Sequence, residues 1–322
     1  MVSSSKKVVY TAIFTNLAIM ACKYGAAVFT GSSAMLAEAL HSTADCGNEL
    51  LLLVGMERSQ RPPDPLHPYG HGKVLYFYSL LVAVYIFGIG GGLAFYDGIT
   101  HLRHAGPSSH AVWNYSVLAL AAALDCYSWR VSYRELSSQK DPDESIWDEI
   151  VGSKNPAIFT VFLEDSAGLI GTAVAFLGIF LGRLLHNPFL DPVASLLIGL
   201  LLAAVAALLG RESGALLVGE RTNRAIIRRV KRIIENDSSV DALGDLLTMQ
   251  LGPNEVLLTV NIRFRRGLDV PELEAAIDRL ESRIRYEEPT IKRIFLEAES
   301  LKPPIRNRWL RGDSGKLQKT GS

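Results

Sequence analysis

Six apolar stretches fill the first two-thirds of the chain, and each approaches the roughly 20 residues that a helix needs to cross a bilayer. The stretches cover residues 8–30, 33–55, 74–99, 112–134, 156–182 and 189–209. The first is too long, and followed too closely by the second, for a cleaved signal peptide. The pattern predicts an all-α transmembrane domain of six helices within residues 1–210.

The last third of the chain has an amphipathic pattern instead. Apolar residues recur at helical spacing in two segments and alternate with polar residues in another, as expected for helices and a half-buried strand. The predicted elements are helices at 222–236 and 270–287 and strands at about 244–251, 256–264 and 291–297. This order predicts a small α+β domain over residues 211–300. The polar segment 301–322 is predicted to be disordered.

The charges are balanced overall but unevenly distributed. The chain carries 33 basic and 33 acidic side chains, so its formal net charge is zero. This balance disfavours nucleic acid as a partner, because nucleic-acid-binding domains normally have a basic excess. Residues 1–210 hold only 12 of the basic and 16 of the acidic groups. We therefore expect a membrane domain followed by a charged domain in water.

Basic residues between the apolar stretches predict the orientation in the lipid bilayer. One set of ends is rich in Lys and Arg, whereas the opposite set carries only Arg103 and Arg183. The rich set holds Lys6, Lys7, Arg58, Arg61, Lys73, Arg130, Arg134, Lys140 and Lys154. Both termini should therefore be cytoplasmic. Because no Arg/Ser-rich leader precedes the first stretch, the expected location is a bacterial inner membrane.

Ionisable residues interrupt two of the apolar stretches, where a charge costs about 2.5 kcal/mol or more. His41 and Asp45 are four residues apart and share one helix face. Glu164 and Asp165 lie in another stretch. At 1.5 Å per residue, Asp45 and Asp165 are at similar depths, about 15 and 13.5 Å from the cytoplasmic helix ends. His41, Asp45 and Asp165 are thus candidate ligands for a divalent cation. The alternative is a polar network that only holds helices together.

Imidazole and carboxylate groups in four-coordination suit zinc, and cobalt, cadmium and manganese are also compatible with this donor set. A different interpretation fits Lys23 and Glu38, which both lie nearer the outer, non-cytoplasmic ends of their apolar stretches. These two residues predict an intramembrane ion pair that neutralises both charges and has a structural role.

A polar connection between the second and third stretches contains a second candidate metal site. Asp64, His67 and His71 are spaced by three and four residues, and several prolines stiffen the segment. One carboxylate and two imidazoles can bind zinc and leave a position open for water or a partner. A solvated histidine-rich loop explains the same spacing equally well.

These motifs resemble the cation diffusion facilitator family of metal/proton exchangers. The matching features are the six-stretch pattern, His-x-x-x-Asp at 41–45 and His-Pro-Tyr-Gly-His-Gly-Lys at 67–73. Residues 36–45, 63–70 and 163–167 are most similar to the zinc-transporter-nine branch. The resemblance implies a homodimer that exports cytoplasmic zinc by alternating access in exchange for protons. It also implies that the C-terminal domain is ferredoxin-like.

By the same resemblance, His41, Asp45 and Asp165 form the transport site, and Asp64, His67 and His71 form the loop site. One position departs from the family pattern, because Val161 stands where a ligand four residues before Asp165 is usual. Either Glu164 replaces that ligand, or water completes a site of three protein ligands. No cofactor is expected, since zinc is the transported substrate. A zinc ion with a structural role is a further expectation.

Other functions remain as alternatives. Manganese, cobalt or cadmium transport would use the same mechanism, and a structural or regulatory membrane protein without transport would tolerate Val161. An intramembrane metalloenzyme is disfavoured, because the His-Glu-x-x-His motif of zinc proteases is absent. We therefore expect a transporter and no enzyme.

Overall fold

The computed structural model describes residues 2–103, 111–139 and 154–298, which fall into two compact units. The helical unit comprises Met1–Asn223 together with Met249–Val256. The sheet unit comprises Arg224–Thr248 and Leu257–Ser322. The predicted disordered tail at 301–322 lies outside the described residues.

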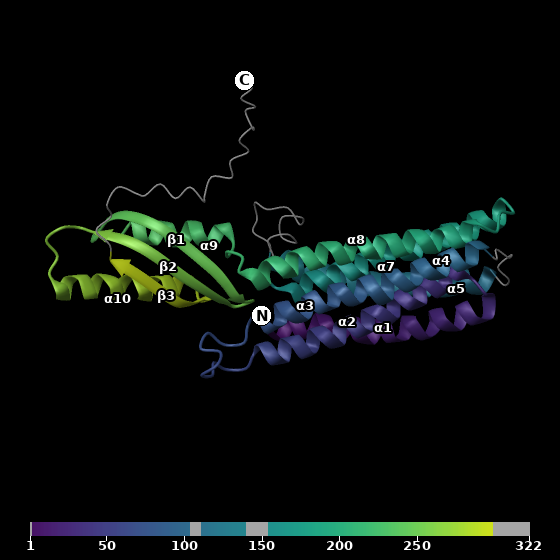
Figure 1. The fold of residues 1–322 in the computed structure, drawn as a ribbon, viewed down its shortest axis with the longest axis horizontal. Helices are drawn as coiled ribbons and strands as arrows, with labels where there is room; N and C mark the ends of the chain where they lie inside the picture. The colour runs from purple at the N-terminus through teal and green to yellow at the C-terminus, as the bar shows by residue number, and fades with distance from the viewer. Residues whose placement is uncertain (1, 104–110, 140–153, 299–322) are drawn as a thin grey trace, which may run out of the picture. The chain divides into compact units, whose positions relative to one another are not determined.

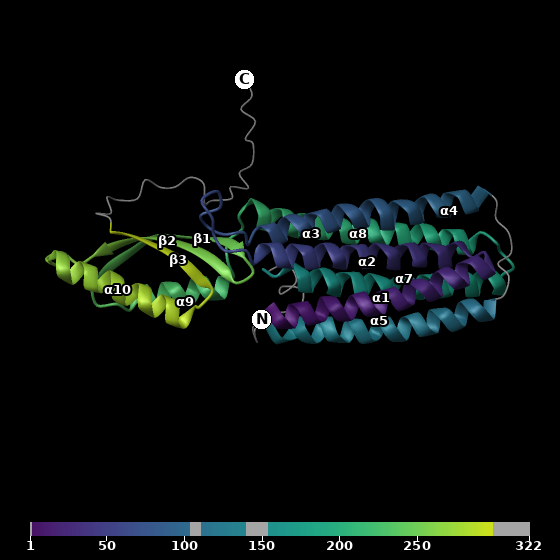
Figure 2. The same ribbon diagram turned by 90° about the horizontal axis from the view of Figure 1, so that it is seen from below.

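Long helices make up the helical unit and run side by side along one direction (Figures 1 and 2). They are α1 (Val2–Thr30), α2 (Ser33–Ser59), α3 (Val74–Tyr85), the π-helical η1 (Ile86–Gly92), α4 (Leu93–Arg103), α5 (Ala111–Gln139), α7 (Pro156–Leu184) and α8 (Leu190–Val218). α3, η1 and α4 follow one another without a break. Every predicted apolar stretch therefore lies within helix.

Among the residues that the structure describes, four helical segments are long and apolar enough to cross a membrane. They are Lys6–Thr30, Val74–Arg103, Pro156–Leu184 and Leu190–Val218. α2 has similar length but carries Glu38, Asp45 and Glu49 among its apolar residues. A mostly helical membrane domain is thus confirmed, and the count of six spanning helices stays a prediction.

Glycines let α8 approach the η1–α4 segment closely. A Cβ added to Gly91 would lie 3.2 Å from the carbonyl oxygen of Gly199, and one added to Gly199 would lie 3.0 Å from the amide nitrogen of Phe95. Without side chains at these positions the two backbones can meet, which is a common way of packing helices in lipid.

The C-terminal part of the chain contains α9 (Arg224–Glu235), β1 (Val240–Gly252), β2 (Glu255–Phe264), α10 (Val270–Glu287) and β3 (Ile291–Ala298). The strand order is β1-β2-β3, and both helices cover one face of the sheet (Figure 2). Alternate β2 residues are fully buried, as the sequence pattern predicted. The element order is confirmed, while the ferredoxin-like fold stays a prediction.

Local signals explain where these elements end. Asp269 caps α10 by accepting a hydrogen bond from the Glu272 amide, and Glu272 bonds back to the Asp269 amide. This capping box satisfies two amides that the helix itself leaves unpaired. After α9, Asp237 accepts hydrogen bonds from the Arg279 guanidinium, which hold the pKa of that carboxyl below its usual range. The Asp237–Arg279 pair ties α10 to the turn before β1.

Candidate metal sites

A buried polar stripe follows one face of α2. His41, Asp45, Asn48 and Glu49 succeed one another at helical spacing, and all are buried. His41 Nδ1 lies 3.3 Å from Asp45 Oδ1, without the alignment of a hydrogen bond. Neither ring nitrogen of His41 has a hydrogen-bond partner among the described residues. The stripe therefore presents unpaired donors and acceptors inside an apolar bundle.

The two acidic residues of α7 turn toward different helices. Asp165 Oδ2 accepts hydrogen bonds from the hydroxyls of Ser128 and Ser132 on α5, at 3.0 and 3.1 Å. Glu164 Oε1 accepts one from the Asn48 amide on α2, at 2.6 Å. This divergence follows from their adjacency, since neighbouring helical residues are about 100° apart. Glu164 therefore faces α2 while Asp165 faces α5.

Asp125 of α5 is a buried acid in this region to which the sequence pattern assigned no role. It is 5% exposed, and its Oδ2 has no hydrogen-bond partner among the described residues. The signal was present, because Asp125, Ser128 and Ser132 have the i, i+3, i+7 spacing of one helix face. Two of these three contact Asp165.

The buried groups of α2, α5 and α7 form one electrostatic neighbourhood. Asp45 interacts with Glu164, Asp125 and Asp165, and Glu49 interacts with Asp45 and Asp165. Glu49 Oε2 and Glu164 Oε2 have no hydrogen-bond partner within the described part of the chain. Buried carboxylates of this kind are unfavourable without a cation or protons to balance them. The arrangement therefore gathers acidic groups of three helices in one buried region.

The predicted pair of Lys23 and Glu38 is confirmed. Lys23 Nζ lies 2.7 Å from Glu38 Oε2, and the side chains are 1% and 0% exposed. Glu38 Oε2 also accepts a hydrogen bond from the Thr172 hydroxyl of α7, at 3.2 Å. The pair therefore connects α1, α2 and α7.

The loop residues Asp64, His67 and His71 come together as the sequence predicted. His67 Nδ1 is 3.1 Å from Asp64 Oδ1, and His71 Nε2 is 3.4 Å from Asp64 Oδ2. Within the described residues, these three form the group whose ligand atoms all lie within 4.8 Å of one another. His41, Asp45 and Asp165 are not gathered to that degree. The structure thus brings these three loop side chains close enough together to hold a metal ion.

Backbone turns shape this loop cluster. Asp64 Oδ1 accepts hydrogen bonds from the amides of Leu66 and His67, and Gly70 adopts a φ of +86° that favours glycine. Desolvation acts to raise the pKa of the Asp64 carboxyl, but the hydrogen bonds from His67 and Leu66 outweigh it and lower that pKa. These hydrogen bonds therefore favour the ionised form of the Asp64 carboxyl.

Removing the loop cluster should lower zinc binding by one ion per chain and abolish the pH dependence of that binding. Since loss of an outer-shell partner already costs about 10–100-fold in affinity, Asp64→Ala should weaken loop binding by at least about tenfold. Binding should also weaken as the pH falls, because protons compete with the metal for the same ligand lone pairs. Titration of the detergent-purified protein with zinc measures both effects. His186→Ala, at an exposed histidine, is the control, and unchanged stoichiometry in the triple variant Asp64→Ala/His67→Ala/His71→Ala would contradict the loop site.

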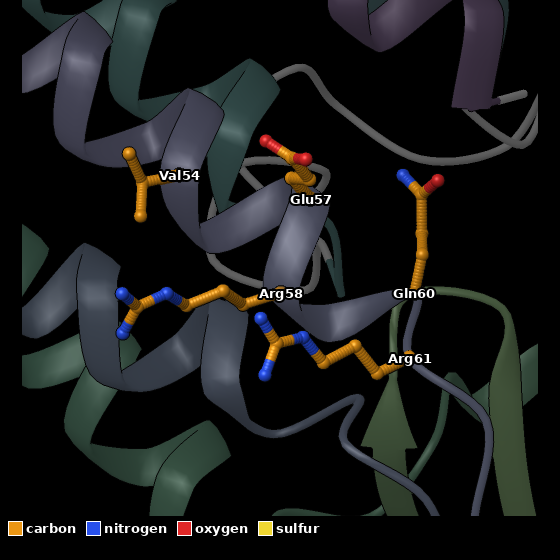
Figure 3. Close-up of a pocket in the computed structure, with 5 residues that line it drawn as sticks. All are labelled: Val54, Glu57, Arg58, Gln60 and Arg61. Carbon is orange, nitrogen blue, oxygen red and sulfur yellow. The ribbon is translucent and has the colours of Figure 1, made fainter.

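A surface pocket at the end of α2 has a different character. It has a volume of about 380 Å³ and is lined by Val54, Glu57, Arg58, Gln60 and Arg61. Figure 3 shows the guanidinium groups of Arg58 and Arg61 extending in the same direction, away from the Glu57 carboxylate. Two cationic groups disfavour a metal ion here, so this pocket is not part of the candidate metal sites.

Long apolar helices with buried ionisable groups define an integral membrane protein, and such groups commonly mark an ion pathway. The sequence matches the cation efflux transmembrane domain over residues 9–218. The chain therefore belongs to the cation efflux family. The predicted family is confirmed.

Three relatives illustrate the similarity. A Xenopus laevis protein named proton-coupled zinc antiporter SLC30A9, mitochondrial, is 34% identical over 80% of this chain and 46% of its own length. Metal tolerance protein C4 of Arabidopsis thaliana is 30% identical over 81% of this chain and 57% of its own. Manganese efflux system protein MneS of Bacillus subtilis is 27% identical over 80% of this chain and 82% of its own length. The chain spans about half the length of the first two. The first confirms the resemblance to the zinc-transporter-nine branch.

Proposed function

We propose that the chain exports zinc from the cytoplasm by alternating access, in exchange for protons. The observation that carries the proposal is the set of buried, unpaired ligand atoms that α2, α5 and α7 direct into one apolar bundle. His41, Asp45 and Asp165 form the centre of the transport site, and the fourth position, for which Val161 offers no ligand, is taken either by Glu164 or by water. The name of the Xenopus laevis relative, which specifies a proton-coupled zinc antiporter, supports this substrate.

Proton exchange follows from the chemistry of the proposed ligands. Metal and protons compete for the same lone pairs of imidazole and carboxylate. The ligands that release the metal can therefore take up protons in its place. Zinc is cargo in this scheme, and no resident cofactor or catalytic step is involved.

Several finer features belong to the same proposal. We propose six spanning helices within residues 1–210, a cytoplasmic ferredoxin-like domain over 211–300 that forms the homodimer, and cytoplasmic termini. The alternation of basic and non-basic helix ends supports this orientation. Location in a bacterial inner membrane stays a prediction, and the relatives include both a protein named mitochondrial and one from Bacillus subtilis.

Manganese is the second candidate substrate, because one relative is named a manganese efflux protein. The test is metal uptake by sealed proteoliposomes under an imposed pH gradient, measured for zinc and for manganese. Gradient-dependent zinc uptake is expected. Manganese uptake without zinc uptake would favour the second candidate, and no uptake of either metal would overturn the proposed transport.

A further inference from the structure

We propose that Asp125 of α5 is a further ligand of the transported metal, acting with His41 across a space left open by Gly168 of α7. The proposal rests on the proposed transport function and adds α5 to the helices that hold the ion.

Gly168 locates the two candidate ligand atoms. A Cβ added to Gly168 would lie 3.4 Å from His41 Nε2 and 3.6 Å from Asp125 Oδ2. The nitrogen and the oxygen therefore flank one point and are no more than 7.0 Å apart. A zinc ion holds two such ligand atoms within about 4.2 Å of each other, a distance that side-chain rotation can reach. The missing side chain of Gly168 leaves this space open.

Both atoms are suited to receive an ion. Asp125 is 5% exposed and His41 is 1% exposed. Asp125 Oδ2 and His41 Nε2 each lack a hydrogen-bond partner in the described parts of the chain. Buried polar atoms are nearly always paired in native proteins, so two unpaired atoms on either side of one point indicate a bound ion between them.

Neutralising Lys23 is a weaker explanation for Asp125. Lys23 interacts electrostatically with Asp125, but its ammonium already has an ion-pair partner in Glu38 at 2.7 Å. The transport site, in contrast, has room for another donor. His41, Asp45 and Asp165 supply three ligands where zinc usually takes four, and Val161 offers none.

The proposal is tested by the zinc affinity of purified protein in which the loop cluster is removed by Asp64→Ala/His67→Ala/His71→Ala. In this parent variant, the measured zinc binding comes from the helical bundle and not from the loop cluster. Asp125→Asn should weaken zinc binding by at least about tenfold, as expected for loss of a direct ligand. Gly168→Ala should weaken it as well, because the added methyl group fills the space while every charge remains. Alanine also favours helix more than glycine, so this variant should fold.

The matched control is Asp97→Asn, another membrane-segment acid, whose carboxylate pairs with His101 at 3.1 Å. Its zinc affinity should stay within about twofold of the parent, because Asp97 lies outside the proposed ligand set. Lys23→Gln/Asp125→Asn separates the two roles of Asp125. A ligand role predicts that the double variant binds as weakly as Asp125→Asn.

Three results would overturn the inference. The first is a zinc affinity within twofold of the parent for both Asp125→Asn and Gly168→Ala, which leaves the proposed transport function standing. The second is restored affinity in Lys23→Gln/Asp125→Asn, which would make Asp125 a countercharge. The third is a parent that binds no zinc in the bundle, which would overturn the transport site together with this inference.

Discussion

Replacing Asp45 or Asp165 by alanine is expected to lower zinc flux by about 100-fold or more, since even outer-shell changes cost about 10–100-fold. Asp45 Oδ1 is buried without a hydrogen-bond partner among the described residues, and the α5 serines hold Asp165 in place. In the proposed transport site, each substitution removes a carboxylate ligand. Flux into proteoliposomes with equal amounts of reconstituted protein measures the loss.

Asp97→Ala provides the control for these two variants. Its carboxylate is paired with His101 on the same helix and is outside the proposed ligand set. Flux should therefore remain near that of the unmodified protein. Full flux in Asp45→Ala would show that the bundle carboxylates do not bind the transported ion.

Lys23→Met is expected to destabilise the protein by about 3–5 kcal/mol, because it leaves the buried Glu38 carboxylate without its ion-pair partner. Lys23→Met/Glu38→Met should recover most of that loss, since the two apolar side chains then replace the whole pair. Denaturant titration of the detergent-solubilised protein measures the free energy of unfolding for the single variants and the double variant.

Arg183→Met is the matched control for the lost cation. Arg183 is exposed in the last turn of α7, so its removal should change the free energy of unfolding by at most about 1 kcal/mol. A Lys23→Met variant as stable as the unmodified protein would contradict the structural role of the Lys23–Glu38 pair.

Helix and strand positions were predictable where a local signal accompanied the hydrophobic pattern. The range Val270–Glu287 of α10 was predicted from its helical pattern with Pro271 at a starting position, and the structure adds the capping box of Asp269 and Glu272. The end of α8 was not, since the apolar run stops near residue 209 whereas the helix continues to Val218. Glu212 is a polar residue in this extension, yet it is buried, so the packing of the bundle rather than the apolar pattern sets the end of the helix.

The candidate sites were predictable to the extent that they lie on one element. His41 with Asp45, and the loop cluster, are spaced so that local geometry brings them together. Asp125 meets His41 only through the packing of α5 against α7, at a position where Gly168 has no side chain. That relation depends on tertiary structure, and a single sequence gives no spacing from which to read it.

Exchange of zinc for protons is tested most directly by proton movement under an imposed zinc gradient. Sealed proteoliposomes containing a pH-sensitive dye receive zinc on the outside, with no initial pH gradient. The proposed exchange predicts that zinc entry drives protons out and makes the lumen alkaline, and that Asp45→Ala abolishes the change. Zinc entry without a change in lumen pH, or an unchanged response in Asp45→Ala, would contradict it.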